Sequence, residues 1–228
     1  LISVFPMLAV YGYHAYHYYE CGGSMYIHRP KPELSTAENL LQMLRPDQKY
    51  TELEAHVLDI ALLLHMEHGG GNNSAFACRV LSSTGTDTYS AISAAVSSLK
   101  GPLHGGANAK VMAQFRDVTE HVKDYNDDDE VRAYLMRVLD GEAGDGACKI
   151  YGLGHAVYTI SDPRAVILKR FAGDMAETKG YAEQFALMET IERVGVPLIM
   201  ERKHLAAPIC ANVDMYSGLV YSMLGIPE

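Results

Sequence analysis

His104 and His155 each stand beside glycines, at places where a side chain could do chemistry. His104 lies in SSLKGPLHGGANAK, between a Pro-Leu pair and Gly105-Gly106, and His155 ends the segment YGLGH. Glycine lets the backbone approach a ligand closely, and proline restricts the chain ahead of it. The spacing predicts a histidine held on a shaped turn at each place, available for proton transfer or hydrogen-bond catalysis. For His104, a core histidine on an ordinary turn between helices is the alternative.

A helix start follows His155 closely. In Asp162-Pro163-Arg164, the aspartate is suited to the N-cap, the proline to the first helical position, and the arginine then lies in the first turn. A cation there opposes the helix dipole unless an anion lies between it and the open N–H groups. This indicates a carboxylate or phosphate site near His155. The alternative is an exposed Arg164 that pairs with a neighbouring acid.

One carboxylate, Asp214, stands among largely apolar residues in NVDMYSG. Burial raises the proton affinity of a carboxylate, which suits it to act as a general base. A plain helix N-cap is the alternative interpretation of Asp214.

His65 and His68 are close enough on a helix to share a face and could contribute to a metal site. The HExxH spacing is missing and no third ligand stands nearby, so we expect no metal. Asn72, beyond the triple glycine, favours a polar pocket instead. A zinc hydrolase built on the two histidines is the alternative, which metal analysis would decide.

The elements that must position these residues are helical. Ser35 and Glu38 form a capping box ahead of a helix around 39–44. A second helix runs from Thr51 to about His65, with an apolar face at helical spacing. That face comprises Leu53, Val57, Ile60, Ala61 and Leu64. Further helices are expected at 107–115, 130–139, 162–175 and 181–194, and strand signals are short, so the chain is predicted to be all-α.

Two other segments have unusual composition. Residues 74–99 are mostly small, with only Arg79 and Asp87 charged, which predicts helices buried at the centre of the molecule or in a subunit interface. The acidic run 124–130 is expected to be a solvated loop and helix start.

Bulk properties exclude several classes. The 228 residues are 48% hydrophobic, enough for one large domain or two modest ones. A net charge of −9 without clustered cations excludes a nucleic-acid surface. The four cysteines form no CxxC pair, which favours a reducing, cytoplasmic compartment. The N-terminal stretch is neither a signal peptide nor a membrane span, and the chain is expected to be part of a longer one.

Taken together, the motifs resemble the citrate synthase family. The matching stretches are HMEHGGGNNS, LKGPLHGGAN, GLGHAVY followed by DPRA, and NVDMYSG, in the family's order. The resemblance implies a citrate synthase-like helical fold and a homodimer. It places residues 1–107 in part of a large dimerisation domain, 108–218 in a small domain, and 219–228 on the return towards the large domain.

The resemblance also implies residue roles. His104, His155 and Asp214 fall on the family's catalytic positions. His68 and Asn72 fall on substrate-binding positions, and Arg164 on a carboxylate-binding one. The resemblance further implies that coenzyme A binds along Asn212 and the glycine-rich backbone of Ile150, Tyr151, Gly152, Leu153 and Gly154. The implied reaction is condensation of acetyl-CoA with oxaloacetate and hydrolysis of citryl-CoA, without a metal or redox cofactor.

The residue types suit this chemistry. Asp214 would remove a proton from the weakly acidic thioester methyl group, while neutral His104 at a helix start donates to the thioester oxygen. His155 would polarise the ketone of oxaloacetate. The family's two further arginines, beyond NVDMYSG, have no counterpart in this sequence. Because these arginines are missing, a non-catalytic dimerising helical fragment is one alternative. The other is a 2-methylcitrate synthase, which would use the same three catalytic residues on propionyl-CoA.

Overall fold

The computed structural model describes residues 1–66, 71–101, 104–155 and 157–226. The chain divides into two compact units: Leu1–His65 together with the last residues from Leu224, and Met66–Met223. Within the described residues there are ten helices and no strand, which confirms the all-α prediction. None of the described helices is long and apolar enough to cross a bilayer. The unit limits differ from the domain limits expected at 107 and 218, which concern domains of the whole family fold and stay a prediction.

The first unit contains α1 (Phe5–Cys21), α2 (Thr36–Leu44) and α3 (Glu52–His65). The predicted capping box at the start of α2 is confirmed, because Ser35 Oγ accepts from the backbone N–H of Glu38 at 3.2 Å and Glu38 Oε2 accepts from that of Ser35 at 2.7 Å. On α3, Val57 and Ala61 are buried as predicted. The other predicted face residues, Leu53, Ile60 and Leu64, are only half-buried.

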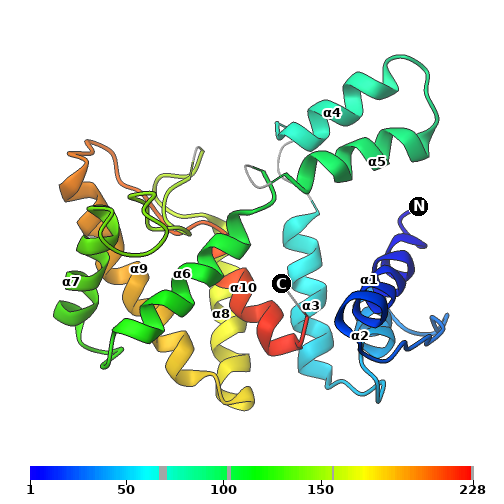
Figure 1. The fold of residues 1–228 in the computed structure, drawn as a ribbon, viewed down its shortest axis with the longest axis horizontal. Helices are drawn as coiled ribbons and strands as arrows, with labels where there is room; N and C mark the ends of the chain where they lie inside the picture. The colour runs from blue at the N-terminus through cyan, green and yellow to red at the C-terminus, as the bar shows by residue number, and fades with distance from the viewer. Residues whose placement is uncertain (67–70, 102–103, 156, 227–228) are drawn as a thin grey trace. The chain divides into compact units, whose positions relative to one another are not determined.

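Helices α4 (Asn73–Ser82) and α5 (Thr88–Leu99) form a hairpin and pack closely on each other (Figure 1). The prediction that this segment is buried at the centre of the molecule is wrong for the single chain. No residue of α4 is buried, and on α5 only Ala91 is. The small side chains instead serve the contact between the two helices, and larger apolar ones stay exposed. These exposed side chains are Phe76, Val80, Tyr89, Val96 and Leu99.

The rest of the second unit is built from five helices. These are α6 (Ala107–His121), α7 (Asp128–Leu139), α8 (Pro163–Lys179), α9 (Ala182–Arg202) and α10 (Asp214–Leu224). The structure thus confirms the helices predicted at 107–115, 130–139, 162–175 and 181–194. Their limits differ from the predicted ones, except for the start at 107 and the end at 139. Helix α9 packs against both α7 and α8. Helix α6 is tied to α10 by a hydrogen bond of 2.6 Å from Asn108 Nδ2 to Ser217 Oγ.

Capping residues set where two of these helices begin. Asp127 accepts from the backbone N–H groups of Asp129 and Glu130 at the start of α7, so the acidic run is a loop and helix start as predicted. Asp162 caps α8, with Pro163 in its first turn.

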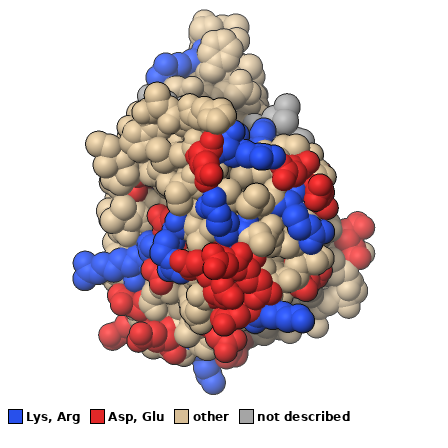
Figure 2. All heavy atoms as spheres, turned by 90° about the vertical axis from the view of Figure 1, so that its left-hand side faces the viewer, with Lys and Arg blue, Asp and Glu red and all other residues tan. Residues whose placement is uncertain are grey.

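One face of the molecule mixes acidic and basic side chains closely (Figure 2). Among the ion pairs that join α7 to α9 are Arg132 with Glu201 at 2.6 Å and Arg193 with Asp128. Exposed pairs of this kind are worth about 0–1 kcal/mol each, so they set surface charge more than stability.

Candidate active site

The loop ahead of His155 is a shaped turn, as its glycines predict. Gly152 has φ +85° and Gly154 φ +94°, in the region that glycine adopts most easily. A Cβ at Gly152 would lie 2.8 Å from the sulfur of Met215 and 3.1 Å from its Cα. The loop backbone therefore lies directly against the first turn of α10, where no side chain would fit.

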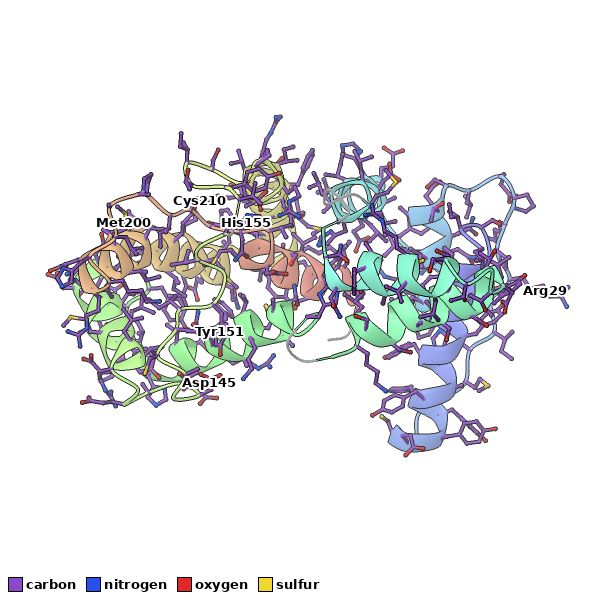
Figure 3. The ribbon with its side chains drawn as sticks, turned by 90° about the horizontal axis from the view of Figure 1, so that it is seen from above. Arg29, Asp145, Tyr151, His155, Met200 and Cys210 are labelled. Atoms are coloured by element: carbon purple, nitrogen blue, oxygen red, sulfur yellow. The ribbon has the colours of Figure 1, made fainter. Side chains whose placement is uncertain are left out.

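Asn212 joins this loop to the start of α10. Its backbone N–H donates to the carbonyl of Gly152 at 2.9 Å, and its Nδ2 donates to the carbonyl of Gly154 at 3.0 Å. Its Oδ1 accepts from the backbone N–H of Asp214 at 3.0 Å. The Gly154 N–H also donates to the carbonyl of Cys210 at 2.7 Å, and Figure 3 shows Cys210 beside His155. One side chain thus connects two of the predicted catalytic segments.

His155 is held in one tautomer. Its Nδ1 accepts from the backbone N–H groups of Val157 at 2.9 Å and Tyr158 at 3.1 Å. A backbone N–H can only donate, so Nδ1 carries the lone pair and the neutral ring has its proton on Nε2. That Nε2 lies 3.3 Å from Nη2 of Arg164, which can only donate, so with the proton on Nε2 this contact is between two donors. Two donors side by side are suited to a ligand with two neighbouring acceptor oxygens, one for each donor.

Arg164 is itself positioned by its helix cap. Its Nε donates to Asp162 Oδ1 at 3.0 Å and its Nη2 to Asp162 Oδ2 at 2.7 Å. The Asp162 side chain is fully buried. Burial would raise the pKa of Asp162, but hydrogen bonds from the side chain and backbone of Arg164 lower it overall. Arg164 therefore pairs with a neighbouring acid, as the alternative interpretation predicts, but its side chain is only 14% exposed. The anion site predicted near His155 stays a prediction.

Asp214 is the first residue of α10 and half-buried. The pKa of Arg164 is raised, chiefly by its hydrogen bonds with Asp162 and in smaller part by the charge of Asp214. The Asp214 carboxylate therefore lies within electrostatic reach of Arg164.

His104 is held in the opposite tautomer. Its Nε2 lies 3.3 Å from the backbone nitrogen of Ser74, which donates to it, and 2.7 Å from Ser74 Oγ. The neutral ring then carries its proton on Nδ1. A Cβ at Gly105 would lie 2.1 Å from the carbonyl oxygen of Leu99, so the predicted tight turn is confirmed. Sequence reasoning missed Ser74, which only the fold brings to His104.

The remaining predicted residues are placed as follows. Asn72 caps α4, its Oδ1 accepting from the backbone N–H of Ala75 at 2.9 Å. His65 Nδ1 lies 2.7 Å from the carbonyl oxygen of Ala61. His68 lies outside the described residues. Within the described part of the chain, no group of three His, Cys, Asp or Glu side chains is arranged to hold a metal ion.

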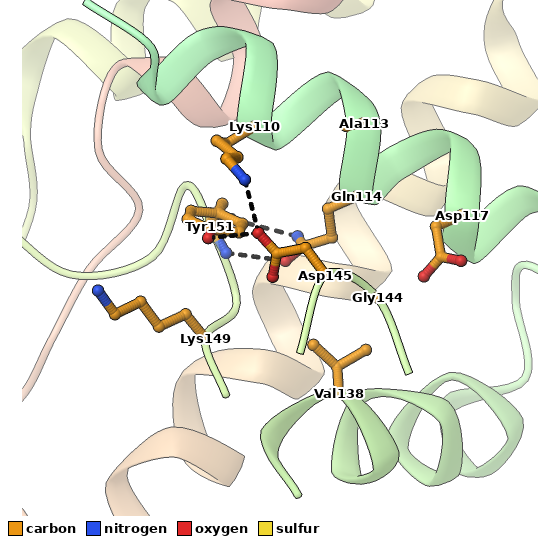
Figure 4. A pocket seen from close by; sticks show the side chains of 9 residues that line it. All are labelled: Lys110, Ala113, Gln114, Asp117, Val138, Gly144, Asp145, Lys149 and Tyr151. Atoms are coloured by element: carbon orange, nitrogen blue, oxygen red, sulfur yellow. Dashed lines mark hydrogen bonds and ion pairs between the residues drawn. The ribbon is translucent and has the colours of Figure 1, made fainter. Parts of the chain in front are cut away.

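A pocket of about 220 Å³ lies beside Tyr151, in the same loop as His155 (Figure 4). Lys110, Gln114, Asp145 and Lys149 are among the residues that line it. Asp145 accepts from Lys110 Nζ at 2.7 Å and from the Tyr151 hydroxyl at 2.8 Å, and these bonds lower the pKa of Asp145 to about 2. Sequence reasoning missed both lysines, because nothing in their local spacing marks them.

Comparisons with known proteins agree on one family. The family model described as the C-terminal domain of citrate synthase matches residues 1–228. A citrate synthase of Deinococcus radiodurans is 39% identical over 199 residues, which cover 87% of this chain and 48% of that protein. The chain thus spans about half the length of the curated relatives it matches.

Solved structures show the same likeness. The citrate synthase of Pyrobaculum aerophilum matches with a TM-score of 0.76 at 31% identity, over 97% of this chain and 49% of that one. The citrate synthase of Thermoplasma acidophilum, solved with carboxymethyl coenzyme A and oxaloacetate, matches with a TM-score of 0.70 at 32% identity, over 87% of this chain and 48% of that one. On the family match along its whole length, this chain belongs to the citrate synthase family.

Proposed function

We propose that this chain carries the reacting groups of a citrate synthase. The reaction condenses acetyl-CoA with oxaloacetate and hydrolyses the resulting citryl-CoA to citrate and CoA. The observation that carries the proposal is the pair of donors formed by His155 Nε2 and Arg164 Nη2, 3.3 Å apart, within electrostatic reach of Asp214. This arrangement suits a substrate that offers a ketone oxygen beside a carboxylate.

Oxaloacetate is proposed to bind at this donor pair. His155 Nε2–H donates to the ketone oxygen, and Arg164 binds a carboxylate oxygen of the same molecule. As the new carbon–carbon bond forms, negative charge moves onto the ketone oxygen, and the proton of His155 passes to it. Because Asp162 holds Arg164 through two hydrogen bonds, the guanidinium is already oriented before substrate binds.

Acetyl-CoA is activated by the other two groups. Asp214 takes a proton from the methyl carbon, while the Nδ1–H of His104 donates to the thioester oxygen, where the enol charge develops. A neutral donor suits this step because it stabilises the charge without a prior proton transfer. Water then attacks the thioester carbonyl of citryl-CoA. The C–S bond breaks, the water oxygen stays with citrate, and CoA leaves with a proton as the thiol.

The coenzyme is proposed to lie along the loop of Ile150–Gly154, near Asn212 and the pocket beside Tyr151. Lys110 and Lys149 line this pocket, and ammonium groups can pair with the phosphates of a nucleotide. Local cations are required because the whole chain carries a net charge of −9. His68 and Asn72 are proposed to complete the oxaloacetate site.

We further propose a cytoplasmic homodimer that needs no metal or redox cofactor. The exposed apolar side chains of the α4–α5 hairpin suit contact with a second copy. All four cysteines are free thiols, which is compatible with a reducing compartment. The proposed condensation and thioester hydrolysis need proton transfer and polarisation by side chains but pass no electrons to an acceptor, so no redox cofactor is needed.

The test is CoA release, followed with a thiol reagent, from acetyl-CoA or propionyl-CoA in the presence of oxaloacetate. We expect turnover with acetyl-CoA and loss of turnover in His155→Ala. Faster turnover with propionyl-CoA would favour a 2-methylcitrate synthase, since one extra methylene changes rates by about 10–200-fold in a fitted pocket. Absence of both turnover and calorimetric oxaloacetate binding would support the non-catalytic scaffold and contradict the proposal.

A further inference from the structure

Gln114 makes an unusual pair of contacts in the second unit. It lies in the middle of α6 and is 7% exposed. Its Oε1 accepts from the backbone N–H of Tyr151 at 2.8 Å, and its Nε2 lies 3.4 Å from the carbonyl oxygen of Tyr151 (Figure 4). Because the N–H can only donate and the carbonyl can only accept, these contacts also fix the orientation of the amide. A single side chain thus binds both backbone groups of one loop residue.

These contacts add to the other hydrogen bonds that hold the loop leading to His155. On the Asn212 side, the loop is bound through Gly152 and Gly154. At Tyr151, Gln114 takes the place that a neighbouring strand would have in a sheet. Further along the loop, Leu153 contacts Gly195 of α9 closely, because a Cβ at Gly195 would lie 2.6 Å from Leu153 Cδ1. The loop is therefore bound from more than one side, and the contact from α6 is made by a polar side chain.

Helix α6 begins at Ala107, three residues after His104, so Gln114 belongs to the element that directly follows one predicted catalytic histidine. The loop that it binds ends at the other, His155. We propose that Gln114 is a positioning residue: it holds the His155 loop at a set distance from α6, and through the loop it orients His155 for the reaction. The role of Gln114 in the reaction rests on the proposed function. Its hold on the loop, meaning the two hydrogen bonds to the backbone of Tyr151, does not.

Three variants test this inference in the full chain. Gln114→Leu removes both hydrogen bonds at similar volume. Gln114→Glu keeps an acceptor for the Tyr151 N–H and loses the donor to the Tyr151 carbonyl. It replaces Gln114→Leu in the measurements if the leucine variant does not fold. Thr190→Val is the matched control, because Thr190 is also buried and polar and its hydroxyl bonds within α9, where it donates to Ala186 at 3.1 Å and accepts from Arg193 at 3.3 Å.

The first measurement is amide hydrogen exchange at Tyr151, which does not require activity. We expect about tenfold faster exchange in Gln114→Leu, the factor that corresponds to one lost hydrogen bond, with a smaller increase in Gln114→Glu and none in Thr190→Val. Unchanged exchange in both Gln114 variants, or the same change in the control, would overturn the hold on the loop.

The second measurement is steady-state kinetics. We expect kcat to fall by at least about tenfold in Gln114→Leu through displacement of His155. The calorimetric Kd of oxaloacetate should rise by less than kcat falls, because displacement of His155 removes its proposed hydrogen bond to the ketone oxygen, whereas Arg164 is still held by Asp162. A merely structural role would lower melting temperature as in Thr190→Val and leave kcat per folded molecule unchanged, which would overturn the role in the reaction. If the wild type shows no turnover but Tyr151 exchange responds as expected, the hold on the loop stands and the proposed function fails.

Discussion

His104 and His155 are held by the same kind of contact in opposite ways. A backbone N–H donates to Nε2 of His104, whereas backbone N–H groups donate to Nδ1 of His155. The first ring therefore presents Nδ1–H and the second Nε2–H. The donor to His104 comes from Ser74, thirty residues earlier, while the donors to His155 lie two and three residues later in the chain. One residue type thus supplies two differently aimed donors, and backbone contacts decide which.

The largest effect is expected when each histidine is replaced by an amide that keeps or loses its donor. An asparagine amide reaches about as far as Nδ1 of histidine, and a glutamine amide about as far as Nε2. His104→Asn and His155→Gln should therefore keep a donor in place, and the swapped pair, His104→Gln and His155→Asn, should not. We expect alanine at either site to lower kcat by about 10²–10⁴-fold, and the matching amide to recover about tenfold of that loss.

The measurement is kcat for CoA release by each of the six variants, with circular dichroism as the control for folding. If the matching and the swapped amides are equally poor, the two rings do not differ in the way their backbone contacts indicate.

A smaller effect concerns the support of Arg164 beside His155. Asp162→Asn keeps a good N-cap for α8 and removes the charge that pairs with Arg164. Loss of one partner of a buried pair should lower the free energy of unfolding at pH 7 by about 3 kcal/mol. Because folding lowers the pKa of Asp162 below its ordinary 3.8, its stabilisation is present above pH 3.8 and is lost as pH falls through the folded-state value.

Urea unfolding of wild type and variant between pH 7 and pH 2.5 measures this effect. The difference between the two proteins should shrink as the solution becomes more acidic. Asp145→Asn is the control, because Asp145 also has a low pKa but is exposed at the surface. A difference that stays constant with pH would contradict a charged Asp162.

The smallest effect is expected when the Ser74 hydroxyl beside His104 is removed. Ser74→Ala removes the hydroxyl 2.7 Å from Nε2 but leaves the backbone N–H, which by itself selects the tautomer. We expect kcat to fall by about threefold or less. A loss as large as that of His104→Gln would show that the hydroxyl, not the backbone, holds the ring.

Local signals predicted much of the fold. The capping box at Ser35 and the Asp162-Pro163 helix start act within one turn, so the sequence shows them directly. The start of α7 was predicted two residues late, from its acidic run, and the start of α9 one residue early, where no side chain caps the helix. Helix α1 was missed, because its apolar residues show little periodicity and many stay exposed. The small-residue stretch at 74–99 was expected at the centre of the molecule or in a subunit interface, since composition indicates close packing but not which partner provides it.

By itself, the sequence determined which residues could react and where the tight turns lie. Glycine at positions 105 and 152 and aspartate before Pro163 act through local sterics and hydrogen bonds, which depend on nearby residues only. Only the tertiary structure decided what each side chain meets: Ser74 at His104, Arg164 at His155, and Gln114 at Tyr151. Contacts between residues far apart in the chain depend on how whole helices pack, and no local pattern encodes that packing.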